Sequence, residues 1–487
     1  MNIYLSESQF KYEIEKLCRI FLPFEKFSFV ADEKSAQILC ILKRTGRKVT
    51  LSAELSLFSE HAALKESTEE TNLKELERRT AALLYRCFEK ITGYRSPWGI
   101  LTGVRPAKLF ASQCKILGDD GARRYFRERL LVSQSKIDLL NTTANSEKAI
   151  IDLSKKRSVS VYIGIPFCPS RCSYCSFVSH SVEHAKKLIP KYVALLCREI
   201  EETAEIAKKL DLQIETVYIG GGTPTTLSGE QLSAVMGAVN AHFKLQNLRE
   251  FTVEAGRPDT VTEERLLSIL QGGATRISIN PQTMNDRVLR AVGRRHAAKD
   301  TVKAMQLARR LGFSNINMDL IAGLPEDTIE SFQQSLEEVL KLSPESVTVH
   351  TLCLKRSAKL SVDGCREVLK QGEEAEKMVD HAKNTLIEAG IFPYYMYRQS
   401  KMVGNLENVG YAKPGFEGLY NVYIMDETHT ILACGASAVT KLKDPISGAI
   451  ERIYNFKYPY EYCNRFEEQL KRKERIEKFY AELHGRY

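Results

Sequence analysis

Three of the twelve cysteines lie within eight residues, in the segment CPSRCSYC at positions 168 to 175. Cys168, Cys172 and Cys175 follow the strand-like run SVSVYIGI, which Pro166 ends. Cysteine thiolates bind zinc and iron–sulfur clusters, and both normally take four ligands. Three thiolates leave one metal position open, and an open position distinguishes a reactive metal site from a closed structural one. The trio therefore predicts a metal group that meets a substrate or cosubstrate.

Two metal groups are compatible with three clustered thiols. A zinc site would need a fourth ligand, which His180 or His184 could supply. However, the spacing C-x3-C-x2-C differs from the C-x2-C pairs that are typical of zinc modules. A [4Fe–4S] cluster held by three thiolates, with one iron left for a cosubstrate, is the better interpretation.

The elements that must position this loop form a regular pattern between residues 158 and 352. Six strand-like runs alternate with amphipathic helical stretches; the runs are SVSVYIGI, ETVYIGGG, REFTVEA, TRISIN, NINMDLI and SVTVHTL. Val- and Ile-rich strands alternating with helices are typical of a parallel sheet with crossover helices. Six units predict an open, partial form of the eight-unit barrel, whose active sites lie at the C-terminal ends of the strands. The cysteine loop is expected at that end.

A chain of 487 residues is too long for one ordinary core, so several domains are expected. Residues 1–150 predict an N-terminal α+β domain of unknown role, with strands at FSFVAD, AQILCILK and KVTLSAEL and a helix over 73–91. Residues 151–352 form the barrel core, and residues 353–487 predict a C-terminal α/β extension that packs on it. The predicted fold class is α/β, a partial (βα)6 barrel with these two additions.

Hydropathy and charge limit the surroundings of the protein. There is no run of eighteen apolar residues, and the N-terminal MNIYLSESQFKYEIEK has no apolar signal core. We therefore expect no membrane span and a cytoplasmic location. The formal net charge is +9, and the stretch from position 95 to 129 contains eight Lys or Arg but only three acidic residues. A solvated helical face explains this stretch better than a nucleic-acid groove.

The segment CPSRCSYC after the first strand resembles the radical S-adenosylmethionine (SAM) superfamily. The resemblance implies a [4Fe–4S] cluster whose fourth iron binds SAM, and electron transfer that cleaves SAM to a 5′-deoxyadenosyl radical. GGGTPT (220–225), RISINPQ (276–282) and NMDLIAGLP (317–325) are similar, in order and spacing, to the oxygen-independent coproporphyrinogen III oxidase family. SPWGILTGVRP and GNLENVGYAKPG are similar to its HemZ-type branch.

This resemblance implies an enzyme of haem biosynthesis. Family members oxidatively decarboxylate two propionates of coproporphyrinogen III to vinyls and release protoporphyrinogen IX. The implied partners are that tetrapyrrole, or a related one, and a reduced flavodoxin or ferredoxin as electron donor. A mildly basic protein would suit a substrate with four carboxylates.

The family's site residues are carried over only where this sequence matches. The cluster ligands are Cys168, Cys172 and Cys175. The implied SAM contacts are Tyr162, Tyr174, Gly221, Gly222, Thr223, Glu254, Gln282, Arg294 and Asp319. The last three match contacts of a second SAM, so the resemblance allows one SAM or two. Gly164 stands where the family commonly has a histidine, which removes that histidine's role from this chain.

Two other functions remain as alternatives. A haem-binding chaperone shares this fold, but such relatives carry H-N-x-x-Y-W where this chain reads YNVYIM, with Tyr420 in place of the histidine. A radical SAM enzyme acting on RNA is suggested by the basic stretch and the extra N-terminal domain. The barrel motifs do not favour this second alternative.

Overall fold

The computed structural model describes residues 1–155, 157–175, 180–353 and 362–484, and the chain forms two compact units. The N-terminal unit comprises Met1–Ala144, Thr351–Asp380 and Met396–Asn408. The barrel unit comprises Asn145–His350, His381–Tyr395 and Val409–Tyr487. The division at residues 150 and 352 stays a prediction, because the segment after residue 352 contributes to both units.

The N-terminal unit is built on a five-stranded sheet of order β2-β1-β3-β4-β5. Its strands are β1 (Asn2–Leu5), β2 (Ser28–Phe29), β3 (Ile38–Thr45), β4 (Lys48–Leu57) and β5 (Glu60–Thr68). Alternate residues of β4 are buried, so one sheet face carries the core. Its helices include α1 (Lys11–Phe21), α2 (Leu73–Thr92) and α3 (Pro106–Arg124). The helix expected over 73–91 is confirmed, and Asn72 caps it by accepting from the amides of Lys74 and Glu75.

The segment SPWGILTGVRP forms a packed corner inside this unit. Trp98 is fully buried, and its indole N–H donates to the Glu407 carboxylate at 2.6 Å. The Nζ of Lys136 donates to the other oxygen of Glu407 at 2.7 Å. Arg398 lies over the Trp98 ring, 5.0 Å from its centroid. The corner is therefore held by buried charges that are paired and hydrogen-bonded.

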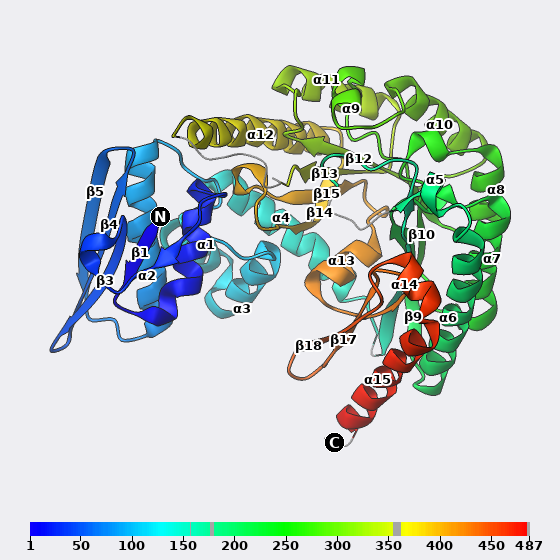
Figure 1. The fold of residues 1–487 in the computed structure, drawn as a ribbon, viewed down its shortest axis with the longest axis horizontal. Coiled ribbons are helices and arrows are strands. Elements are labelled where there is room, and N and C mark those ends of the chain that lie inside the picture. The colour runs from blue at the N-terminus through cyan, green and yellow to red at the C-terminus, as the bar shows by residue number, and fades with distance from the viewer. Residues whose placement is uncertain (156, 176–179, 354–361, 485–487) are drawn as a thin grey trace. The chain divides into compact units, whose positions relative to one another are not determined.

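The barrel unit contains the six predicted strands, which lie side by side in chain order. They are β6 (Ser158–Ile165), β9 (Gln213–Gly221), β10 (Glu250–Glu254), β11 (Arg276–Ser278), β12 (Ile316–Ala322) and β13 (Ser346–Thr351). The first five pair in parallel with their neighbours. Figure 1 shows helices along the outside of this curved sheet, namely α6 (Ile189–Lys209), α7 (Gly229–His242), α8 (Glu263–Gln271) and α10 (Ala298–Arg310). The prediction of a partial (βα)6 barrel is confirmed.

The C-terminal extension adds strands to both edges of this sheet. On one side β13 is followed by β15 (Asn408–Ala412), which is antiparallel to it, and then by β14 (Phe392–Tyr397). On the other side β16 (Thr430–Cys434) pairs in parallel with β6, followed by β17 (Val439–Lys443) and β18 (Ile450–Tyr454). Among the described strands, β14 and β18 form the edges, so the sheet is open.

Helix α13 (Leu419–Asp426) lies on the inner side of the curved sheet (Figure 1). The Glu250 carboxylate, at the start of β10, accepts from the amides of Leu419 at 2.6 Å and Tyr420 at 3.2 Å. A carboxylate on the first amides of a helix stabilises its N-terminus. The barrel strand thus fixes where α13 begins and, with it, the place of Tyr420.

The remaining α-helices in the described part of the chain are α4 (Gln134–Ile151), α5 (Val182–Ala185), α9 (Asp286–Ala291), α11 (Ile329–Lys341), α12 (Val362–Glu388), α14 (Pro459–Asn464) and α15 (Phe466–His484). None of the helices in the described ranges has both the length and the apolar composition needed to span a bilayer.

Three of the ion pairs among the described residues join α6 to α15, and two of them differ clearly in burial. Glu199 and Lys473 are 3.0 Å apart with side chains 0% and 3% exposed, whereas Lys209 and Glu477 are 2.7 Å apart at the surface. We expect Lys473→Met to lower the free energy of unfolding by about 3–5 kcal/mol, because it leaves a buried carboxylate without its cation. Lys209→Met should cost at most about 1 kcal/mol. Urea denaturation of both variants measures the difference, and equal effects would contradict this account.

Candidate functional site

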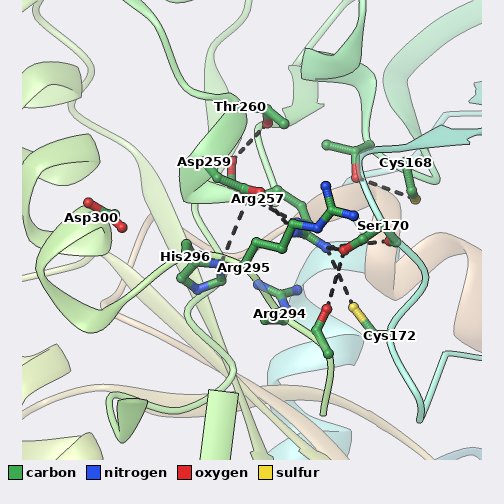
Figure 2. Close-up of polar contacts among 12 residues, drawn as sticks. Cys168, Ser170, Cys172, Arg257, Asp259, Thr260, Arg294, Arg295, His296 and Asp300 are labelled. Carbon is green, nitrogen blue, oxygen red and sulfur yellow. Dashed lines mark hydrogen bonds and ion pairs between the residues drawn. The ribbon is translucent and has the colours of Figure 1, made fainter. Parts of the chain in front are cut away.

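The cysteine loop leaves the C-terminal end of β6, where the sequence predicts it. The short strand β7 (Phe167–Cys168) opens the loop and pairs with β8 (His180–Ser181). Cys172 is buried, whereas Cys168 and Cys175 are partly exposed. The Thr223 hydroxyl donates to the Sγ of Cys168 at 3.5 Å. The Nη1 of Arg257 donates to the Sγ of Cys172 at 3.7 Å (Figure 2). The thiols of Cys168 and Cys172 therefore have protein donors beside them.

Within the described ranges, no three His, Cys, Asp or Glu side chains converge so that they could hold a metal ion. The ligand assignment to the cysteine trio, and the zinc alternative with His180 or His184, therefore stay predictions. The surroundings of the loop do fit a bulky group bound by thiolates. A Cβ at Gly222 would lie only 3.0 Å from the Sγ of Cys168 and 2.6 Å from the carbonyl oxygen of Phe167. Only glycine keeps the space beside that thiol open.

The glycine turn after β9 is tied directly to the cysteine loop. Gly221 has a φ of 111°, which favours glycine. The amide of Gly222 donates to the carbonyl of Ile165 at 2.7 Å, and the amide of Thr223 donates to the carbonyl of Phe167 at 2.8 Å. Two backbone hydrogen bonds thus join the loop and the turn at the C-terminal ends of β6 and β9.

A stack of three tyrosines lies beside this assembly. The rings of Tyr162 and Tyr218 are 6.2 Å apart at 17°, and those of Tyr218 and Tyr420 are 4.5 Å apart at 23°. Burial raises the pKa of all three phenols, so they stay protonated at neutral pH. Tyr162 was predicted as a site residue, but Tyr218 and Tyr420 were not. Tyr218 could have been found from the sequence, since it precedes Gly220 by two residues and so faces the same side of β9.

Glu254 ends β10 and accepts a hydrogen bond from the Tyr218 hydroxyl at 2.5 Å. Burial, and secondarily the nearby Asp319 carboxylate, raise the pKa of Glu254 to about 7, although the Tyr218 hydrogen bond opposes the shift. Asp319 in turn accepts from Asn317 at 2.7 Å and lies 3.6 Å from the Nε2 of His350. The structure therefore brings two predicted site residues, Glu254 and Asp319, into one acidic site.

The raised pKa of Glu254 predicts a pH-dependent stability. Between pH 4.5 and about 7 the unfolded chain has an ionised Glu254 while the folded chain keeps the proton, so stability falls as pH rises. We expect Glu254→Gln to gain about 1–3 kcal/mol over wild type between pH 4.5 and pH 8. Urea denaturation of both proteins at pH 4.5 and at pH 8 measures this gain in the free energy of unfolding. Glu230→Gln, at an exposed position of α7, should follow wild type; the same behaviour for Glu254→Gln would contradict the assignment.

Gln282 lies in the segment after β11, and Arg294 lies in the segment after α9. Gln282 is buried with a φ of 70°, and its amide donates to the carbonyl of Asp319 at 2.9 Å. Arg294 is buried; its Nε donates to the hydroxyl of Tyr174 at 3.0 Å and its Nη1 to the carbonyl of Asn280 at 2.6 Å. Arg294 therefore fixes Tyr174 of the cysteine loop against the segment after β11.

Three further residues near the loop were missed by sequence reasoning, namely Arg257, Asp259 and His296 (Figure 2). Arg257 and Asp259 pair at 2.8 Å, and the Nδ1 of His296 lies 3.9 Å from Asp259. A weak signal was present, because Arg257 and Asp259 follow Glu254 directly in the loop after a barrel strand, where such folds place functional groups.

Comparison with known proteins agrees with this geometry. The family model of the Radical SAM superfamily matches residues 162–339. The oxygen-independent coproporphyrinogen-III oxidase-like protein HemZ of Bacillus subtilis is 35% identical over 93% of this chain and 93% of its own. Heme chaperone HemW of B. subtilis is 32% identical over 62% of this chain and 77% of its own. Coproporphyrinogen III oxidase (HemN) of Escherichia coli, a solved radical SAM enzyme, superposes with a TM-score of 0.50 at 22% identity, covering 67% of this chain and 73% of that one.

The fold and the cysteine loop define a radical SAM protein. With a relative matched over nearly its whole length, the chain belongs to the HemZ-type family of oxygen-independent coproporphyrinogen III oxidase-like proteins within that superfamily. This confirms the resemblance seen in the sequence. The cofactors of the family, a [4Fe–4S] cluster and SAM, are accordingly those of this chain.

Proposed function

We propose that the chain is an oxygen-independent coproporphyrinogen III dehydrogenase, which converts two propionates to vinyls and yields protoporphyrinogen IX. The observation that carries the proposal is the joined cysteine loop and glycine turn at the C-terminal end of the barrel strands, next to the half-buried Glu254. The similarity to HemZ over 93% of the chain supports the tetrapyrrole substrate. The location in the cytoplasm is part of the same proposal.

In this proposal Cys168, Cys172 and Cys175 hold the cluster. When bound together, the cluster and SAM supply the one-electron chemistry that removes a hydrogen atom from an unactivated carbon. The protein's task is to bind, orient and shield. Gly221 and Gly222 let the backbone approach the cosubstrate closely, and Thr223 follows them beside the Cys168 thiol.

Side chains on the neighbouring strands are proposed to contact SAM. Glu254, in its carboxylate form, would accept from the amino group or ribose, and Tyr162 would cover the same side. Tyr174 is held by Arg294 and would lie beside the adenine. Gln282, Arg294 and Asp319 are proposed to complete the binding site. Equilibrium binding of SAM to the cluster-loaded protein counts one molecule or two.

The proposed partners follow from the reaction. The cluster must be reduced, and a flavodoxin or ferredoxin is the proposed donor. The tetrapyrrole carries four carboxylates, and the formal charge of +9 suits an anionic substrate.

The test is an anaerobic reaction of the reconstituted protein with SAM, a strong reductant and coproporphyrinogen III. We expect 5′-deoxyadenosine together with monovinyl and divinyl products, detected by mass spectrometry. Deoxyadenosine without vinyl products would overturn the substrate and direct the search to another tetrapyrrole or to RNA. Absence of both products would overturn the proposal that the chain is such an enzyme.

A haem chaperone is the second candidate, because HemW is 32% identical to this chain. That similarity covers 62% of the chain, compared with 93% for HemZ. Tyr420, which replaces the histidine of the chaperone motif, is 4% exposed and stacks on Tyr218, so it is a buried core residue. Haem titration by absorbance separates the two functions: tight binding of one haem per chain without vinyl products would favour the chaperone.

A further inference from the structure

Arg257 lies against the cysteine loop and uses all three arms of its guanidinium group. Its Nε and Nη2 donate to the two carboxylate oxygens of Asp259 at 3.0 and 2.8 Å. Its Nη1 donates to the Ser170 hydroxyl at 3.1 Å, to the Ser170 carbonyl at 3.4 Å and to the Sγ of Cys172 at 3.7 Å (Figure 2). One side chain therefore joins the loop after β10 to the sulfur of a proposed cluster ligand.

The position of this guanidinium is fixed by its carboxylate partner. A bidentate arginine–carboxylate pair sets both distance and plane, so the third arm points in one direction. The Arg257 side chain is only 4% exposed, and a buried cation is stable only when it is paired. Arg257 lowers the pKa of Asp259, which keeps the carboxylate ionised at neutral pH. The pair is consequently a preorganised donor aimed at the loop.

His296 closes the far side of Asp259. Its side chain is fully buried, and among the described residues neither ring nitrogen has a hydrogen-bond partner. Burial lowers the pKa of His296 to about 4, so the ring is neutral at pH 7. Arg294 also lies near the loop, but its Nε and Nη1 donate to the Tyr174 hydroxyl and the Asn280 carbonyl. Arg257, in contrast, donates to the Cys172 sulfur itself.

We propose that Arg257 is a positioning residue that tunes the cluster: its donation to the Cys172 sulfur raises the reduction potential of the [4Fe–4S] cluster. Hydrogen bonds to cluster sulfurs and nearby charge set the potential, and a cation favours the reduced form because that form is more negative. The inference rests on the cluster placed at this loop but not on the tetrapyrrole substrate.

The test compares Arg257→Gln and Arg257→Lys with wild type and with Arg309→Gln. Arg309 donates to both oxygens of Glu345 at 2.9 and 2.8 Å and to the carbonyls of Phe313 and Ser343, so the control removes another arginine–carboxylate pair, which lies away from the cysteine loop. Each protein is reconstituted anaerobically, its iron and sulfide are counted, and the midpoint potential is measured by EPR-monitored titration without substrate.

For Arg257→Gln we expect the ratio of reduced to oxidised cluster at a fixed potential to fall about tenfold, which is about 59 mV for one electron. In Arg257→Lys this ratio should fall in the same direction but by less. An ammonium group keeps the positive charge, but it cannot hold Asp259 and donate to the sulfur in the same geometry. Arg309→Gln should match wild type.

Wild-type potentials in both Arg257 variants at normal iron content would overturn the proposal. If Arg257→Gln fails to take up iron, the potential of Arg257→Lys is the deciding measurement. A wild-type potential in Arg257→Lys would then overturn the proposal. A failure to make vinyl products leaves these potentials unaffected, so the tuning role and the proposed reaction fail independently.

Discussion

Replacing Cys168 with serine is expected to abolish formation of 5′-deoxyadenosine and to remove most of the cluster iron. Serine keeps the size of the side chain but loses the thiolate that an iron–sulfur cluster requires. Loss of a group that only orients a metal ligand typically costs about 10- to 100-fold in affinity or activity, so loss of a ligand itself should exceed about 100-fold. Iron analysis, visible absorbance and mass spectrometry of the nucleoside measure the effect.

Cys197→Ser is the matched control for this substitution. Cys197 is also partly exposed, and its thiol donates to the carbonyl of Ala234 at 3.6 Å, between two outer helices. We expect it to keep wild-type iron content and activity. Full deoxyadenosine formation by Cys168→Ser would show that Cys168 is not a ligand of the cluster and would contradict the proposed site.

Gly222→Ala is expected to lower the affinity for SAM and the iron content together. The new Cβ would lie 2.6 Å from the Phe167 carbonyl oxygen, closer than real Cβ atoms approach, and in a tight contact of 3.0 Å with the Sγ of Cys168. That carbonyl accepts the amide of Thr223, so the clash cannot be relieved without moving the loop or the turn. Such overpacking costs about 1–3 kcal/mol, or about 5- to 150-fold in binding.

Gly237→Ala tests whether this effect is local. Gly237 lies within α7, and a Cβ there would have nothing within 4 Å. Alanine in a helix interior is favoured over glycine by about 0.5–1 kcal/mol, so this variant should be slightly more stable and bind SAM normally. Isothermal titration with SAM compares the two variants. Unchanged affinity and iron content in Gly222→Ala would show that the turn does not adjoin the bound cofactors.

Much of the barrel could be predicted because its strands are apolar runs of regular spacing. The run SVSVYIGI was predicted as a strand, and β6 spans those same residues, Ser158–Ile165. Helices on one face and α13 on the other bury such strands, so their sequence carries a strong signal. The position of the cysteine loop follows from the same rule, because it leaves the end of a barrel strand.

The contributions of the C-terminal extension could not be predicted in the same way. β16 pairs in parallel with β6, but a run such as TILAC indicates a strand without indicating its neighbour. Likewise, the place of Tyr420 in the tyrosine stack depends on the capping of α13 by Glu250, a contact between distant parts of the chain. Local sequence patterns do not encode such pairings.

The Arg257–Asp259 pair shows a different limit. Both residues are charged and lie in a loop with Gly and Pro, a composition that predicts a solvated turn. Arg257 is nevertheless buried, because its guanidinium packs against Ser170 and Cys172 of the cysteine loop. Ion pairs in loops have no periodic signature, so only the assembled structure identifies this one.

The most direct test of the central claim follows one hydrogen atom. Coproporphyrinogen III deuterated at the propionate carbons next to the ring is incubated anaerobically with the reconstituted protein, SAM and reductant. We expect one deuterium in 5′-deoxyadenosine for each vinyl group formed, and no label when unlabelled substrate reacts in D₂O. Vinyl products accompanied by unlabelled 5′-deoxyadenosine would contradict abstraction of that hydrogen atom at this site.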